Sequence, residues 1–195
     1  MVKEEKNGEC KEYYENDVIH EIRNYKNGKL NGKYIEYYDN GKIKQSGYYK
    51  EGVLDGDYIE YHYNGKVKEK SKYYNGILDG KYMEFNDNGK IKEEGNYENG
   101  LLHGVYIEYY YNGKVKEKSN YENGNLEGVY KEYYESGNLM QIGNYIDNKL
   151  NGEWKYYNGD GSIWTNKKYI NGNSFKIIIL KNNILSKYDT MLVLT

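Results

Sequence analysis

The sequence contains no proline, one cysteine, two phenylalanines and two tryptophans in 195 residues. A single cysteine, Cys10, excludes an internal disulfide. No apolar run approaches the roughly 20 residues that span a membrane, and residues 1–6 lack the apolar segment of a signal peptide. The net charge of −2, with acids and bases interspersed, shows no dominant basic surface for nucleic acid. We therefore expect a cytoplasmic protein that binds no nucleic acid.

Tyrosine and glycine are abundant in the chain. The chain has 28 tyrosines and 23 glycines, 30% charged residues and a mean hydropathy of −1.08. Tyrosine buries a large ring while its hydroxyl stays in water, which predicts a thin, well-solvated structure without a thick core. Glycines this frequent are unfavourable in helices and tolerated in strands and turns.

The glycines recur with a period of 24 residues. A fixed period of this length is typical of a repeat architecture in which each unit stacks on its neighbours. We divide the chain into a leader (1–7), seven 24-residue units (8–175) and a tail (176–195). The first glycine series consists of Gly8, Gly32, Gly56, Gly80, Gly104, Gly128 and Gly152.

Each unit carries two turn signals. Asn40-Gly41 and its copies lie between β-prone runs, which predicts a two-residue type I′ hairpin turn. The second signal, Gly52 to Gly56, predicts a longer loop between hairpins. The predicted fold is all-β: an elongated, single-layer antiparallel meander of stacked β-hairpins.

The predicted turn sets a register that pairs a large ring with a small residue. It places Tyr34 opposite Gly47, and residues paired across strands share one face of a sheet. Aromatic cover of a strand glycine stabilises sheets. The same step pairs Tyr58 with Ser71, Tyr82 with Gly95, Tyr106 with Ser119 and Tyr130 with Gly143, and at the ends Cys10 with Arg23 and Trp154 with Lys167.

Two further tyrosine series run through the repeats. One forms an aromatic ladder along the stack, and the other, in which Phe85 replaces one tyrosine, is expected on the opposite face. Rigid tyrosine side chains suit partner binding. The candidate interaction surface therefore comprises Tyr49, Tyr73, Tyr97, Tyr121 and Tyr145 from the first series and Tyr37, Tyr61, Tyr109 and Tyr133 from the second.

No group of residues indicates catalysis, a metal site or a cofactor. His20, His62 and His103 occupy different positions in their units, and Cys10 has no histidine near it in sequence. We interpret Cys10 as a small buried filler near an edge. The glutamates at Glu36 and its copies repeat too regularly for a catalytic pair, which is unique and lies in a pocket. We expect a solvated stripe, with no enzymatic activity and no small-molecule substrate.

A basic stripe accompanies these acids. Lysines near a surface attract anionic lipid headgroups, or they serve solubility and edge protection. Both readings remain open from the sequence. The stripe consists of Lys42, Lys44, Lys66, Lys68, Lys90, Lys92, Lys114 and Lys116.

The tail at residues 176–195 leaves the repeat pattern. It holds two apolar runs, 177–180 and 191–194. One or two capping strands or a disordered end would both fit this composition.

The repeat resembles that of MORN-repeat proteins. The stretch from Asn96 to Gly104 is similar to the family's Tyr-Glu…Asn-Gly-Lys-x-His-Gly core, and the likeness extends from Gly8 to Phe175. It is closest to the bacterial variant of the repeat, because Tyr106 stands where the eukaryotic form has glycine. The resemblance implies a hairpin stack and a role as scaffold, dimerisation module or phospholipid binder. The bacterial variant further implies an antitoxin or immunity role.

We therefore expect a non-enzymatic scaffold that binds a protein partner. The antitoxin role is a narrower form of this hypothesis, and binding to anionic membrane phospholipids is the alternative.

Overall fold

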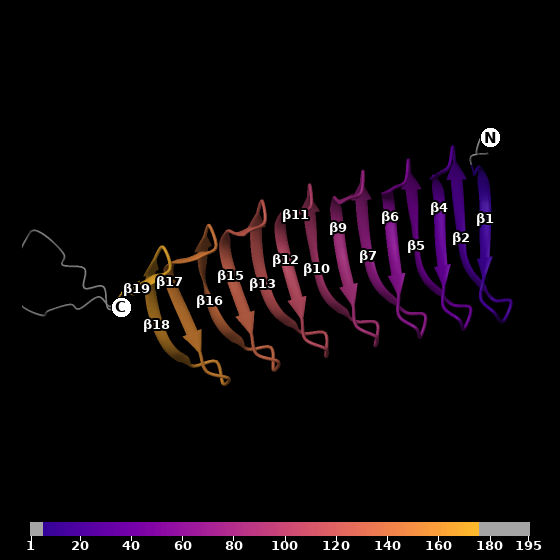
Figure 1. Ribbon diagram of the computed structural model, residues 1–195. Helices are drawn as coiled ribbons and strands as arrows, with labels where there is room; N and C mark the ends of the chain where they lie inside the picture. Colours follow the sequence, from indigo (N-terminus) through magenta and orange to yellow (C-terminus); the bar gives the residue numbers. More distant parts are fainter. Residues whose placement is uncertain (1–5, 176–195) are drawn as a thin grey trace, which may run out of the picture.

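The computed structural model describes residues 6–175, and this part of the chain is all-β. The strands form one open antiparallel sheet in which each pairs with its neighbour along the chain (Figure 1). The predicted single-layer meander is therefore confirmed. The strands are β1 (Gly8–Tyr13), β2 (Ile19–Lys26), β3 (Lys29–Leu30), β4 (Gly32–Tyr37), β5 (Ile43–Lys50), β6 (Val53–Tyr61), β7 (Val67–Tyr74), β8 (Ile77–Leu78), β9 (Gly80–Phe85), β10 (Ile91–Glu98), β11 (Leu101–Leu102), β12 (Gly104–Tyr109), β13 (Val115–Glu122), β14 (Asn125–Leu126), β15 (Gly128–Tyr133), β16 (Leu139–Ile146), β17 (Lys149–Tyr157), β18 (Ile163–Ile170) and β19 (Asn173–Phe175).

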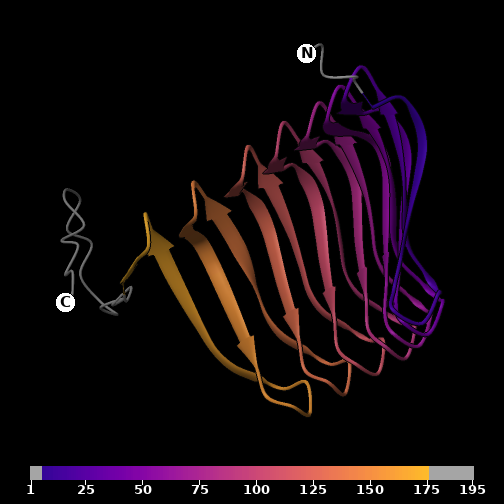
Figure 2. The ribbon, with the colours of Figure 1, turned by 45° about the vertical axis from the view of Figure 1, so that its right-hand side comes forward.

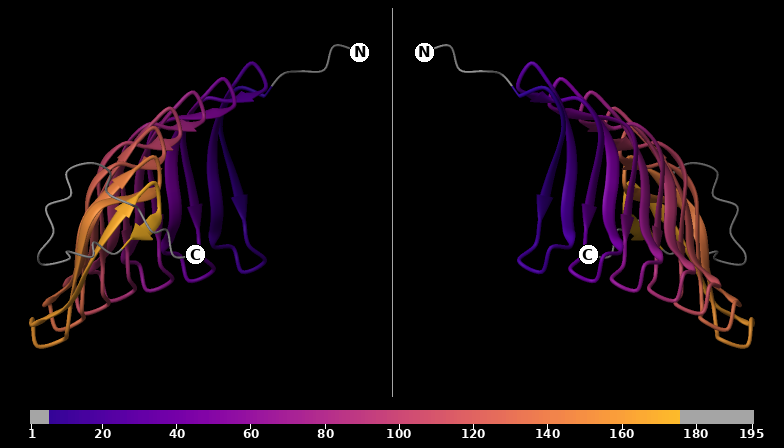
Figure 3. Two further views of the ribbon diagram at one scale, coloured as in Figure 1. Left: turned by 90° about the vertical axis from the view of Figure 1, so that its left-hand side faces the viewer. Right: turned by 90° about the vertical axis from the view of Figure 1, so that its right-hand side faces the viewer.

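The sheet is elongated and curved. The strands bend in the same direction along their length, and no second layer of the described chain covers either face (Figures 2 and 3). Among residues 6–175, no helix is long and apolar enough to cross a membrane. The predicted tail (176–195) and most of the predicted leader (1–7) lie outside the described residues.

The hairpin tips differ from the predicted type I′ turn. At the Asn40-Gly41 tip, Gly41 alone has positive φ (77°), its N–H donates to the Tyr38 carbonyl, and the Tyr38 N–H donates to the Lys42 carbonyl. This is a three-residue loop with a left-handed glycine at its end. A β-bulge next to it, between Glu36 and Tyr37, shifts the register by one residue.

The type I′ geometry occurs instead at the other end of the strands, where we expected longer loops. Asn75 (φ 49°) and Gly76 (φ 81°) both lie in the left-handed region, and Tyr74 pairs with Ile77 across them. Glu51 and Gly52 form the same turn. The predicted loop from Gly52 to Gly56 is thus a tight turn followed by the start of β6. Asparagine and glycine tolerate positive φ in both turn types, so the dipeptide alone does not distinguish them.

The ring-over-small-residue register is confirmed in every predicted pair. Tyr34 lies opposite Gly47, and the two end pairs form as expected. The bulge compensates for the different turn, so the predicted pairing holds beyond it. The other confirmed pairs are Tyr58–Ser71, Tyr82–Gly95, Tyr106–Ser119 and Tyr130–Gly143.

Strand alternation gives the sheet two different faces. We call the side that carries Tyr34, Tyr49 and Leu54 the tyrosine face, and the side that carries Lys33, Ile35 and their cross-strand partners the open face. On the tyrosine face, rings of the Tyr34 and Tyr49 series pack edge to face at 5.4–6.0 Å. Trp154, 1% exposed, belongs to this thin core.

Successive hairpin tips are joined by side-chain hydrogen bonds. The hydroxyls of Tyr14, Tyr38, Tyr110 and Tyr134 each donate, at 2.6–2.8 Å, to a backbone carbonyl 23 residues further on. Asn86 occupies the corresponding position, and its buried Nδ2 has no hydrogen-bond partner in the described structure. The side chain of asparagine is too short for this bond.

We expect Asn86→Tyr to stabilise the protein by about 1 kcal/mol, because the new hydroxyl reaches the Tyr109 carbonyl and an unpaired buried amide is removed. Urea unfolding monitored by tyrosine fluorescence measures the change. Tyr110→Phe, which removes the same bond one repeat later, is the matched control and should cost about 1 kcal/mol. Equal stability of the Asn86→Tyr variant and the parent would contradict the prediction.

Candidate interaction surface

The nine predicted interface tyrosines do not form one surface. The Tyr49 series lies half-buried on the tyrosine face, where each ring packs against one from the Tyr34 series. The Tyr37 series lies on the opposite, open face, as predicted, and each member pairs with an aliphatic residue such as Ile43. A single partner on one face would therefore contact only one series. These side chains remain candidates for binding, on two separate faces.

The hydroxyls of the tyrosine face bond to polar side chains. Tyr106 donates to Glu93 at 3.0 Å, Tyr130 to Glu117 at 3.1 Å, and Tyr58 to Gln45 at 2.6 Å. Burial, followed by nearby carboxylates, raises the pKa of Tyr106 and Tyr130 well above the ordinary value. On the open face, burial and the bond to Glu94 raise the pKa of Tyr109 to about 12. These hydroxyls are neutral donors at pH 7.

Glutamates form a continuous cross-strand row on the tyrosine face. The sequence pattern showed the copies of Glu36, but the pairing between hairpins inserts a second series between them. Like charges directly opposite each other destabilise a sheet. The row runs Glu12, Glu21, Glu36, Gln45, Glu60, Glu69, Glu84, Glu93, Glu108, Glu117, Glu132 and Gln141.

Four members of this row have a lysine partner. The lysines at the bulges bond to Glu36, Glu60, Glu84 and Glu108 at 2.8–2.9 Å. These glutamate side chains are 13–27% exposed, so the expected solvated stripe is in fact half-buried. Burial raises the pKa of Glu36, but bonds from Lys44 and Gln45 outweigh it, and the net pKa is lowered.

Among the described residues, the central carboxylates between them, Glu69, Glu93 and Glu117, have no ion-pair partner. Ser71 donates to Glu69 at 2.7 Å, yet burial and the flanking carboxylates of Glu60 and Glu84 raise the pKa of Glu69 above its ordinary value. At the two corresponding positions near the ends of the row the chain has Gln45 and Gln141, whose amides donate to Glu36 and Glu132. The central carboxylates are thus a local source of instability.

The lysines of the basic stripe, for which lipid binding and solubility were both open, are bonded within the protein. Those at the tips donate to the backbone of the next tip: Lys42 to Asn64 and Lys66 to Asn88, both at 2.9 Å. Lys90 and Lys114 repeat the bond. The second set, Lys44 and its copies, binds the glutamates. Both sets hold the repeats together.

Exposed hydrophobic side chains gather on the open face. Tyr48, Tyr74, Val105 and Val129 are 48–64% exposed and lie on this face by strand pairing. Large exposed apolar patches mark interaction sites. The others on this face are Tyr13, Val53, Ile77, Leu101, Ile146, Ile163 and Ile170; among the described residues only Tyr63, Tyr111 and Trp164 are exposed elsewhere.

One cluster of potential metal ligands occurs at the N-terminal edge, where Glu12, His20 and Glu21 have ligand atoms within 4.8 Å of one another. Arg23 contacts the carboxylates of both Glu12 and Glu21. A guanidinium already serves as the cation here, so an ion pair accounts for the cluster. Cys10 is half-buried opposite Arg23, rather than the buried filler that we expected.

An open sheet of stacked 24-residue hairpins, with exposed apolar side chains on one face, defines a β-repeat binding scaffold. The family model described as MORN repeat variant matches residues 6–27, 30–51, 54–75, 78–99, 102–123 and 126–147. The chain therefore belongs to the MORN repeat variant family, whose repeat is a non-catalytic scaffold that generally binds proteins or membranes. No curated protein matches the chain. Our division into seven units stays a prediction.

Proposed function

We propose that the protein is a non-enzymatic scaffold that binds a protein partner through its open face, in the cytoplasm. The observation that carries this proposal is the concentration of exposed hydrophobic side chains on that face. On the tyrosine face, by contrast, the rings are half-buried and pack on one another, and they stabilise the sheet.

Sequence variation among the repeats of the chain also supports the open face as the binding surface. Position 49 and its copies are always tyrosine, and position 54 and its copies up to residue 150 are always leucine. On the open face, the position of Lys33 varies through Asp57, Lys81, Val105, Val129 and Glu153. Positions that build the sheet must repeat, whereas positions that recognise a partner need not. The open face therefore offers a non-repeating surface for specific binding.

Membrane binding is less well supported by the side-chain contacts. The lysines that suggested it donate to backbone carbonyls or to glutamates. Binding a headgroup with them would require breaking these contacts. The antitoxin role is a narrower form of the proposal, in which the partner is a toxin that the open face covers.

Affinity capture with the tagged protein from its native cells tests the proposal. We expect a stoichiometric protein partner in the cytoplasmic fraction. The triple variant Leu101→Ser, Val105→Ser and Val129→Ser should lose it, because these apolar side chains on the open face are 48–52% exposed. The matched control, Tyr63→Ser with Tyr111→Ser, removes rings at the hairpin tips that are 56% and 60% exposed, and it should retain the partner. No stoichiometric partner, or equal loss in both variants, would overturn the proposal.

A further inference from the structure

The open face is basic, although the whole chain has a net charge of −2. Among the residues that strand pairing places on this face, lysines outnumber acidic residues by roughly two to one. The lysines are Lys11, Lys26, Lys29, Lys33, Lys50, Lys70, Lys72, Lys81, Lys118, Lys131, Lys149, Lys155 and Lys168; the acids are Glu9, Asp57, Glu94, Glu98, Glu122 and Glu153. Strand alternation thus separates charges that are interspersed in the sequence, because the glutamate row occupies the other face.

Most of these lysines have no ion-pair partner. Lys11, Lys29 and Lys81 pair with Glu9, Glu51 and Glu94 at 3.1–3.6 Å. Within residues 6–175, the other lysines of the open face form no salt bridge. This contrasts with the lysines at the tips and bulges, which are all bonded. The ammonium groups of the open face therefore keep their charge available for a partner.

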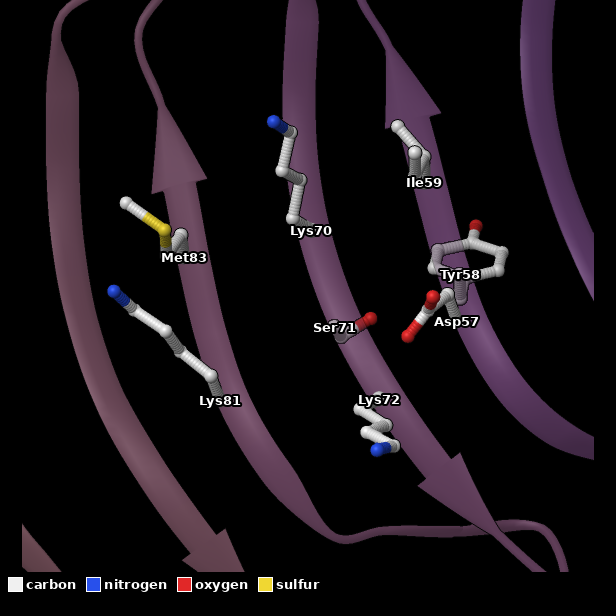
Figure 4. Close-up of a pocket in the computed structure, with 8 residues that line it drawn as sticks. All are labelled: Asp57, Tyr58, Ile59, Lys70, Ser71, Lys72, Lys81 and Met83. Carbon is white, nitrogen blue, oxygen red and sulfur yellow. The ribbon is translucent and has the colours of Figure 1, made fainter.

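The lysines and apolar side chains meet in a shallow hollow of ≈ 290 Å³ over β6, β7 and β9. Figure 4 shows Ile59 and Met83 on the two outer strands of the hollow, Lys70 and Lys72 on the central strand β7, and Lys81 beside Met83 on β9. Asp57 is the one acid that lines it. A hollow in which lysines alternate with apolar side chains suits an apolar anchor flanked by acids.

We propose that the open face binds an acidic polypeptide surface whose apolar side chains insert between the lysines. This inference rests on the proposed function and adds the chemistry of the partner. Opposite charge steers association and sets specificity, and the apolar contacts supply affinity.

A protein fits this face better than the other polyanions. Apart from Glu9, the five acidic residues of the open face lie among the lysines. Their carboxylates would repel the evenly spaced phosphates of a nucleic acid or a lipid surface. A second copy of the chain is also a poor match, because the carboxylates of its tyrosine face are half-buried and partly bonded to lysine. An acidic protein surface can place its charges unevenly, to match the mixed pattern.

Fluorescence anisotropy with synthetic peptides tests the inference. One labelled peptide carries blocks of aspartate and glutamate separated by leucine and phenylalanine; the second has lysine at each acidic position. We expect the acidic peptide to bind at least about tenfold more tightly than the basic one, and to weaken as salt rises from low to high ionic strength.

Two triple variants distinguish the effect of the open-face lysines from the effect of the protein's net charge. Lys70→Gln with Lys72→Gln and Lys81→Gln should weaken binding of the acidic peptide at least about fivefold. Lys42→Gln with Lys66→Gln and Lys114→Gln changes the net charge equally, away from the open face, and should change binding less than about twofold. Circular dichroism checks that both variants keep the sheet.

Several results would overturn the inference. They are equal binding of the two peptides, an equal effect of the two triple variants, or tighter binding to single-stranded DNA or phosphatidylserine vesicles than to the acidic peptide. Self-association that occupies the open face, measured by sedimentation, would do the same. A captured partner that binds the Lys70 triple variant normally would leave the proposed function intact and refute the acidic partner.

Discussion

Gly143→Ser is expected to destabilise the protein by about 3 kcal/mol, because a Cβ at this position would overlap the indole of Trp154. The indole is 1% exposed and packs against Tyr130 and Tyr145, at centroid distances of 5.8 and 5.2 Å, so it cannot move aside without disrupting its neighbours. Chemical denaturation of purified variants measures the loss.

Gly95→Ser is the matched control in a central repeat. Its Cβ would lie 3.3 Å from Cδ2 of Tyr106, a contact that a small shift of the ring relieves. The chain already has serine at the neighbouring positions Ser71 and Ser119. We expect a loss below about 1 kcal/mol. Equal losses of stability in the Gly143→Ser and Gly95→Ser variants would show that the Trp154 indole does not exclude a side chain at position 143.

Replacing the three central carboxylates that lack lysine partners should stabilise the protein at pH 7. We expect Glu69→Gln, Glu93→Gln and Glu117→Gln together to add about 1–3 kcal/mol, because each removes like-charge contacts on both sides. The amide can donate to the preceding glutamate of the row, as Gln45 donates to Glu36. The comparison is unfolding of the parent and the triple variant across a pH series.

The stability gained by the triple variant should increase as pH rises. The pKa of Glu69 is raised by folding, so its stabilising contribution is complete below the unfolded pKa and is lost as pH rises through the folded pKa. The variant should therefore gain over the parent as pH rises above about 4.5 and show little advantage near pH 3. Glu36→Gln is the control with the opposite sign: its pKa is lowered, so substitution should cost stability at pH 7. A gain independent of pH would mean that charge is not its cause.

The fold was accessible from the sequence because pairing within a hairpin is local. The 24-residue period and the tyrosine opposite a small residue predicted the register of Tyr34 with Gly47 and of each later copy. The turn types were assigned to the wrong ends of the strands. Asn-Gly in the tip loop and Asn-Gly in the tight turn share the same preference for positive φ, and only the hydrogen bonds distinguish them.

The candidate interaction surface stays a prediction. Tyrosines were selected because rigid side chains suit partner binding, and the structure shows that the Tyr49 series packs within the tyrosine face. The Tyr37 series of the open face repeats and was predicted, whereas position 33 and its copies vary from repeat to repeat and so gave no periodic signal. Strict alternation along β6, applied to Asp57, Ile59 and Lys70 opposite it, would have indicated a shared face.

By itself, the sequence determined the repeat length, the all-β class and the contacts inside each hairpin, because these depend on turn preferences and on residues a few positions apart. Only the tertiary structure decided how one hairpin meets the next. That register joins two glutamate series into one row, bonds the tip lysines to neighbouring backbones, and collects unpaired lysines and exposed apolar side chains on the open face. The physical reason is that these contacts join residues of different repeats, and the bulges and turns that set their register are visible only once the strands are paired.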